Sequence, residues 1–213
     1  MLRALAAAAA ALLCAGGSPV AASRAVYFEG TKNARASSLG ADWELADNSF
    51  CARELARYIF LTTGDYPELV DTMEEPTALD RALADSQHDA ILLVSPGSRL
   101  LDHAISLSGA EQLRVAADSM DASAEAGHHT IHRLSARGHS ESSFTVIVGA
   151  GEFGRLYGVY SAAEQLGVRF QLTGDILPDP TSPRGLPLAG VARLPLSERD
   201  YASPMFEFRG LQP

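Results

Sequence analysis

Residues 144–172 read FTVIVGAGEFGRLYGVYSAAEQLGVRFQL, and this stretch decides the fold. It opens with a β-branched and aromatic run that is typical of a strand, followed by a glycine-rich turn. Apolar side chains then recur at helical spacing, which predicts a helix over residues 153–166 with one buried stripe. The stripe comprises Phe153, Leu156, Tyr157, Tyr160, Ala163 and Leu166. Gly167 ends this helix, and alternating side chains predict another strand over 168–172 with one buried face.

The turn Gly149-Ala150-Gly151-Glu152-Phe153-Gly154 matches the dinucleotide-binding pattern G-x-G-x-x-G between a strand and a helix. Asp175 follows about 20 residues later, where an acid would bind the ribose. A dinucleotide fold needs further strand–helix units, however, and the chain that follows is rich in proline. Glu152 would also place a carboxylate where pyrophosphate binds. We therefore interpret these glycines as a tight turn that, with Gly158, lets the helix lie close on the sheet. An NAD-linked oxidoreductase stays as a weaker alternative.

The same residues carry a family resemblance. GRLYGVYSAAEQLGVRF, GDILPDP and SPMFEFRGLQP follow one another within residues 154–213. In this order they resemble the end of the non-catalytic N-terminal domain of β-N-acetylhexosaminidases, α-glucuronidases and related secreted glycosidases. In those proteins the first segment is the last helix and strand of the accessory domain, and P-x-F-x-x-RG enters a (β/α)8 barrel. The match is clear over residues 144–213 and holds only in outline before them.

The resemblance implies a division of the chain. Residues 23–172 are expected to form a β-hexosaminidase-like accessory domain, 173–203 a Pro-rich linker, and 204–213 the start of a truncated catalytic barrel. The acidic pair and the sugar-binding arginine of such enzymes lie further along those chains and have no counterpart here. The implied partner is therefore a catalytic barrel domain absent from this chain, with carbohydrate as a further possible ligand.

The N-terminus has the features of a signal peptide over residues 1–22. Arg3 supplies the positive charge, Ala4–Leu13 an apolar run too short to span a bilayer, and residues 20–22 a small-residue cleavage site. Cys14 raises the alternative of a lipid anchor, but the bulky residue before it disfavours that alternative. We expect a secreted or periplasmic protein with no membrane association after cleavage.

Composition excludes several classes of protein. The hydrophobic fraction of 46% indicates a folded globule rather than a disordered chain. The formal net charge of −9, without a cluster of Lys or Arg, disfavours binding to nucleic acid or anionic membranes. Once Cys14 is removed, Cys51 is the only cysteine, so no disulfide can form within the chain.

The remaining patterns predict an α/β fold. Strands are expected over residues 24–29, 89–95, 129–135 and 142–148, and a second helix over 48–63. We predict a mixed sheet of four or more strands, with a hairpin at 129–148 and the segment 168–172 as a further candidate strand. Each main helix has a single apolar stripe, so both should pack on one face of the sheet. The other face is left for a partner domain or for the helical segment 98–125.

Histidine and cysteine side chains were considered as ligands or nucleophiles. His128, His129 and His132 suggest a metal site, but His129 and His132 would point to opposite faces of a strand. We interpret these histidines as solvated or edge residues. Cys51 lies on the apolar stripe of the 48–63 helix and is assigned to the core rather than to catalysis.

Paired carboxylates and serines were examined for hydrolytic chemistry. The acid pairs Glu74-Glu75 and Asp175/Asp179 lie in segments expected to be exposed, and glycoside cleavage needs two carboxyl groups held around a cleft. The chain also lacks a G-x-S-x-G elbow, since Ser98, Ser108 and Ser140 lack that frame. No catalytic, cofactor-binding or metal-binding residue is therefore assigned. The leading hypothesis is an accessory domain that is inactive alone, and the rival is a stand-alone secreted carbohydrate- or protein-binding module.

Overall fold

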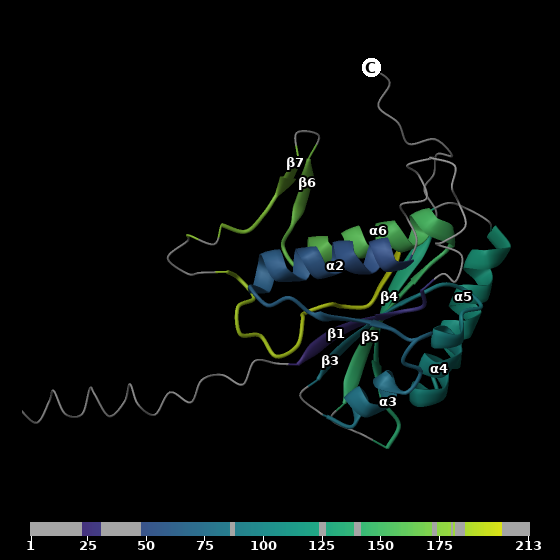
Figure 1. Ribbon diagram of the computed structural model, residues 1–213. Coiled ribbons are helices and arrows are strands. Elements are labelled where there is room, and N and C mark those ends of the chain that lie inside the picture. The colour runs from purple at the N-terminus through teal and green to yellow at the C-terminus, as the bar shows by residue number, and fades with distance from the viewer. Residues whose placement is uncertain are drawn as a thin grey trace, which may run out of the picture.

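The computed structural model describes residues 23–30, 48–85, 88–123, 127–138, 142–171, 174–179, 181 and 186–201. The expected signal peptide and the expected barrel start at 204–213 lie outside these residues. The described part forms three layers, with a central sheet between two layers of helices (Figure 1). None of its helices is long and apolar enough to cross a membrane.

The central sheet has six strands in the order β2-β1-β3-β5-β4-β8. Their bounds are β1 (Arg24–Phe28), β2 (Glu68–Asp71), β3 (Asp89–Val94), β4 (His129–Ser135), β5 (Ser143–Gly149) and β8 (Arg199–Tyr201). β2, β1, β3 and β5 are parallel, whereas β4 runs antiparallel to both β5 and β8. The predicted mixed sheet and its hairpin are confirmed.

The two faces of the sheet carry different helices. On one face lie α2 (Asn48–Thr63) and α6 (Gly151–Gln165), side by side as predicted (Figure 1). The other face carries α3 (Ala78–Leu83), α4 (Arg99–Ser108) and α5 (Glu111–Ser123), so the segment 98–125 does fill the second face. β3 is buried along its whole length because neighbouring side chains enter opposite cores.

The ends of the sheet differ from expectation. The edge strands β2 and β8 and the short helix α3 were not predicted. The segment expected as a further strand of the main sheet, 168–172, contributes β6 (Arg169–Gln171) instead to a separate ribbon with β7 (Gly174–Ile176). This ribbon projects past α2 and α6 (Figure 1), so its assignment to the central sheet was wrong.

Part of the expected linker belongs to the domain. Leu194 and Leu196 are buried in the core beneath α2 and α6, and β8 then pairs with β4. Asp89 accepts hydrogen bonds from Arg24 Nε and from Leu194 N, both at 2.9 Å, while Arg24 also donates to the carbonyl of Val191. We call residues 191–198 the strap. A buried ion pair therefore fixes the strap to the sheet, and the domain continues past residue 172 to β8.

Candidate functional site

Helix α6 presents a different face to the sheet from the one predicted. Its buried residues include Gly154, Gly158 and Ala162, whereas Phe153 is 55% exposed and Tyr157 is half-buried. Of the expected stripe, only Ala163 and Leu166 are buried. The predicted stripe is therefore confirmed for Ala163 and Leu166 and wrong for Phe153, because small residues rather than aromatic ones lie closest to the sheet.

The glycines explain this arrangement. A Cβ added at Gly158 would lie 2.7 Å from Ile147 Cγ2 on β5, and one at Gly154 would lie 2.6 Å from the carbonyl oxygen of His128. A Cβ at Gly149 would meet the backbone of the first turn of α6 at 2.3 Å. Only glycine allows such close approach. The predicted role of these glycines in a tight turn and close helix packing is confirmed.

An aromatic cluster joins the β6–β7 ribbon to the helices. The ring of Phe170 lies 5.6 Å from that of Tyr58 on α2 and 5.1 Å from that of Tyr160 on α6. The hydroxyl of Tyr58 donates to Asp175 of β7 at 2.8 Å. Burial raises the pKa of Tyr58, and its hydrogen bond to Asp175 raises this pKa further. The ribbon is thus anchored at its base, while Arg169, Gln171 and Ile176 remain exposed.

Beyond this cluster, α2 and α6 carry an aromatic outer surface. Phe60 is 46% exposed and lies against Tyr66 at a ring distance of 6.3 Å. Phe153 lies against Tyr157 at 6.5 Å. We call the side chains Phe60, Tyr66, Phe153 and Tyr157 the aromatic face. The aromatic face comprises two exposed pairs, Phe60–Tyr66 at the end of α2 and Phe153–Tyr157 at the start of α6. Exposed apolar side chains mark candidate interaction sites, so the aromatic face is the candidate functional site of this domain.

The histidines do not form a metal site. His129 is buried, with Nδ1 2.8 Å from the carbonyl oxygen of Gly127 and Nε2 2.7 Å from Ser161 Oγ on α6. It is therefore not a solvated residue, which corrects that interpretation. His132 lies 3.3 Å from Glu198, and His128 lies 3.4 Å from Asp200, across the β4–β8 pair. Among the described residues, no three His, Cys, Asp or Glu side chains converge on a metal position.

The acid pairs are exposed, as expected. Glu75 forms an exposed ion pair with Arg81, and Glu74 is exposed beside it. Asp175 binds Tyr58, and the hydrogen bonds from Thr181 lower the pKa of Asp179. Neither pair lines the pocket described below.

Two other candidates have structural roles. Cys51 lies on α2, and its side chain is buried in the core, as predicted. Ser98 is the N-cap of α4, where its side chain accepts a hydrogen bond from Leu101 N at 3.2 Å.

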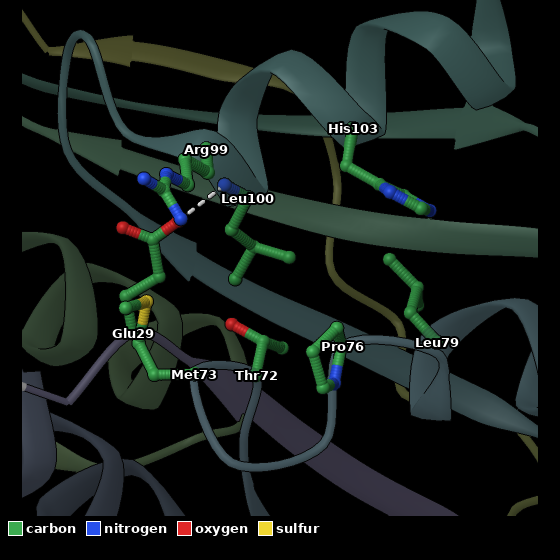
Figure 2. Close-up of a pocket in the computed structure, with 8 residues that line it drawn as sticks. All are labelled: Glu29, Thr72, Met73, Pro76, Leu79, Arg99, Leu100 and His103. Carbon is green, nitrogen blue, oxygen red and sulfur yellow. Dashed lines mark hydrogen bonds between the residues drawn. The ribbon is translucent and has the colours of Figure 1, made fainter.

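A pocket lies outside the carboxyl ends of β1 and β2, beside the start of α4 (Figure 2). Glu29, Arg99 and His103 supply its charged or titratable groups, and Leu79 and Leu100 are among its apolar residues. Local sequence patterns do not reveal this pocket, because its residues come from four separate segments of the chain. The charged Glu29 directly after a buried strand was the one local signal that could have indicated it.

Comparison with known proteins adds no assignment. A scan against models of protein families finds no match to this chain, and a search of curated proteins finds no significant relative.

Proposed function

We propose that this chain is the non-catalytic accessory domain of a secreted glycoside hydrolase and that its aromatic face packs against a catalytic (β/α)8 barrel. The observation that carries the proposal is the orientation of α6, which leaves Phe153 exposed and Tyr157 only half-buried. Large side chains at helical spacing normally face a core. Here they face outward, which favours a second protein surface lying over them.

The β6–β7 ribbon supports the same proposal. A two-stranded ribbon is marginally stable when it stands alone. Among the described residues, this ribbon contacts the domain through Phe170, through Asp175 and through Leu177 directly after it, and the exposed Ile176 adds apolar surface. A partner that covered both the ribbon and the aromatic face would remove this apolar surface from water.

The resemblance to glycosidase accessory domains names the kind of partner. The segment GRLYGVYSAAEQLGVRF, which carries the resemblance, covers residues 154–170 and supplies most of α6, Tyr157 of the aromatic face and two residues of β6. In the proposed protein the barrel would supply the catalytic carboxylates, and this domain would support it. The proposal therefore expects no glycoside hydrolysis by this chain alone.

Two measurements test the proposal. The coding sequence after codon 213 should continue in frame into a barrel, and a stop codon there would contradict it. The purified 23–213 fragment should show no turnover of aryl N-acetylglucosaminides or of xylan fragments carrying glucuronic acid. Turnover that one of Glu74→Gln, Glu75→Gln, Asp175→Asn or Asp179→Asn abolishes would make this chain itself an enzyme.

A stand-alone carbohydrate-binding module is the second candidate, because exposed aromatic rings can also bind a ligand directly. Titration calorimetry of the fragment with oligosaccharides and with NAD separates the candidates. Oligosaccharide binding lost in Phe153→Ser would favour the module, and tight NAD binding would favour an oxidoreductase. We do not favour the oxidoreductase, because close packing already accounts for Gly149 and Gly154.

A further inference from the structure

The pocket of Figure 2 lies at the point where the order of the sheet reverses. β1 leads into α2 on one face of the sheet, whereas its neighbour β3 leads into α4 on the other face. Glu29 directly follows β1, and Arg99 is the first residue of α4. In open α/β sheets, the crevice outside the carboxyl ends of such strands is the usual position of a ligand.

Hydrogen bonds hold the backbone that forms one wall of the pocket. Asp71, at the end of β2, accepts hydrogen bonds from Gly30 N and from Met73 N, both at 2.9 Å. Thr72 donates from both its amide and its hydroxyl to the carbonyl of Phe28. The ends of β1 and β2 are therefore tied together, and the side chains that line the pocket start from a rigid base.

Two charged groups in the pocket have unused hydrogen-bonding capacity. Leu100 N donates to Glu29 Oε1, which fixes this carboxylate at the start of α4 (Figure 2). Within the described part of the chain, neither Glu29 Oε2 nor the guanidinium of Arg99 has a hydrogen-bond or ion-pair partner. His103, by contrast, is engaged through Nε2 with Asp80 at 2.9 Å. Glu29 can accept hydrogen bonds and Arg99 can donate them.

The chemistry of these groups selects a class of ligand. A carboxylate and a guanidinium sum to no net charge, so Glu29 offsets the attraction of Arg99 for a phosphate, and Arg99 offsets the attraction of Glu29 for a cation. Adjacent hydroxyl groups satisfy both, because a hydroxyl donates as well as accepts. The exposed Pro76 offers apolar surface to the carbon-bound hydrogens of a ring, with the buried Leu79 and Leu100 behind it. The open volume of about 160 Å³ exceeds the need of one water and falls below that of drug-sized ligands.

We propose that this pocket binds one neutral sugar ring, whose hydroxyl groups bridge Glu29 and Arg99 above Leu79, Leu100 and Pro76. The site is separate from the aromatic face, and the inference does not rest on the proposed accessory role. A catalytic function is not implied, because binding requires only the hydrogen bonds and apolar contacts described.

The test is a titration of the 23–213 chain, followed through backbone amide resonances in nuclear magnetic resonance. The probes are N-acetylglucosamine, xylose, inorganic phosphate and glycine, a zwitterion that could also bridge the two charges. We expect saturable binding of at least one sugar in the millimolar range, with the amides of Met73 and Leu100 among those that shift. Saturable binding of phosphate or glycine alone, or no saturable binding at all, would overturn the proposal.

Substitutions localise the binding. Arg99→Gln and Glu29→Gln should each weaken sugar binding about tenfold, because each removes hydrogen bonds to a charged group. Arg53→Gln is the matched control, since Arg53 is exposed on α2 in the other helical layer and should leave the affinity unchanged. Arg99 is itself exposed, so its variant should fold even if Glu29→Gln disturbs the start of α4. Equal affinities for Arg99→Gln and Arg53→Gln would place the sugar elsewhere and refute the site.

Discussion

The two helical layers of this domain have opposite outer surfaces. Over α2 and α6, large aromatic side chains such as Phe60 and Phe153 are about half exposed. Over α3, α4 and α5, Val115 is the large apolar side chain exposed among the described residues, and polar contacts lie beside it: Asp102 binds Arg114 at 2.8 Å, and His103 Nε2 lies 2.9 Å from Asp80 Oδ1. Both layers bury apolar side chains on the same sheet, so the sheet does not cause the difference. The proposed accessory role accounts for this contrast, since a partner barrel would cover the layer that exposes the aromatic side chains.

The largest expected effect concerns the buried Arg24–Asp89 pair, which binds the strap on the α2–α6 side of the sheet. Asp89→Ala removes the acceptor for both Arg24 and Leu194 and leaves the Arg24 guanidinium buried without its carboxylate. Loss of one partner of a buried pair costs about 3–5 kcal/mol. We expect a decrease of that size in the free energy of unfolding, measured with urea.

The control lies on the charged layer. Asp102→Ala breaks only the exposed pair with Arg114 and should change the unfolding midpoint little. Equal losses in the two variants would mean that the strap does not stabilise the α2–α6 side.

The second prediction tests why the aromatic residues of α6 face outward. Gly154→Ala should lower the free energy of unfolding by about 1–3 kcal/mol, because the new methyl group would press on the backbone oxygen of His128. Helix propensity alone favours alanine by about 1 kcal/mol. The sign of the change in the free energy of unfolding therefore distinguishes the two effects. A more stable Gly154→Ala variant would show that α6 does not need glycine against the sheet.

The third and smaller effect concerns pH on the charged side of the sheet. His88 is buried, with Nδ1 2.8 Å from Ser23 Oγ and Nε2 3.1 Å from Tyr27 Oη. Burial lowers the pKa of His88 below its usual 6.5, against the opposing charges of Asp85, Asp89 and Glu68. Below about pH 6.5 the unfolded chain therefore binds a proton that the folded chain does not, so stability falls as the pH decreases.

Unfolding free energies measured between pH 5 and 8 check this prediction. Stability should be constant above the usual histidine pKa and should decline below it, and His88→Gln should decline less steeply than the wild type. An unchanged slope in His88→Gln would assign the pH dependence to other groups.

Much of the fold could be predicted from local sequence patterns. The helix over 48–63 and the strand over 129–135 have the predicted bounds, because the spacing of their apolar residues is a local property. β2 and α3 escaped prediction, since four and six residues are too few to establish a period. β8 escaped because its three residues are polar and follow a Pro-rich segment, and only pairing with β4 makes them a strand.

The candidate sites were harder to predict. Phe153 and Tyr157 have the spacing of a core stripe, and hydrophobicity alone cannot distinguish core residues from apolar residues on the surface. The deciding signal was steric: Gly154 and Gly158 mark the side of α6 that must approach the sheet. Prediction of the pocket would also have required the order of the strands, because only that order brings Glu29 and Arg99 to the same pocket.

The most direct test of the central claim is site-specific photocross-linking in the producing cell. A photoreactive phenylalanine analogue would replace Phe60 or Phe153 on the aromatic face and, as a matched control, Val115, which is 70% exposed on the other layer. The account predicts adducts from Phe60 and Phe153 only, in which mass spectrometry identifies peptides of a glycosidase (β/α)8 barrel, either in the same chain or in a partner. Adducts formed equally from Val115, or no barrel peptide from either aromatic position, would contradict it.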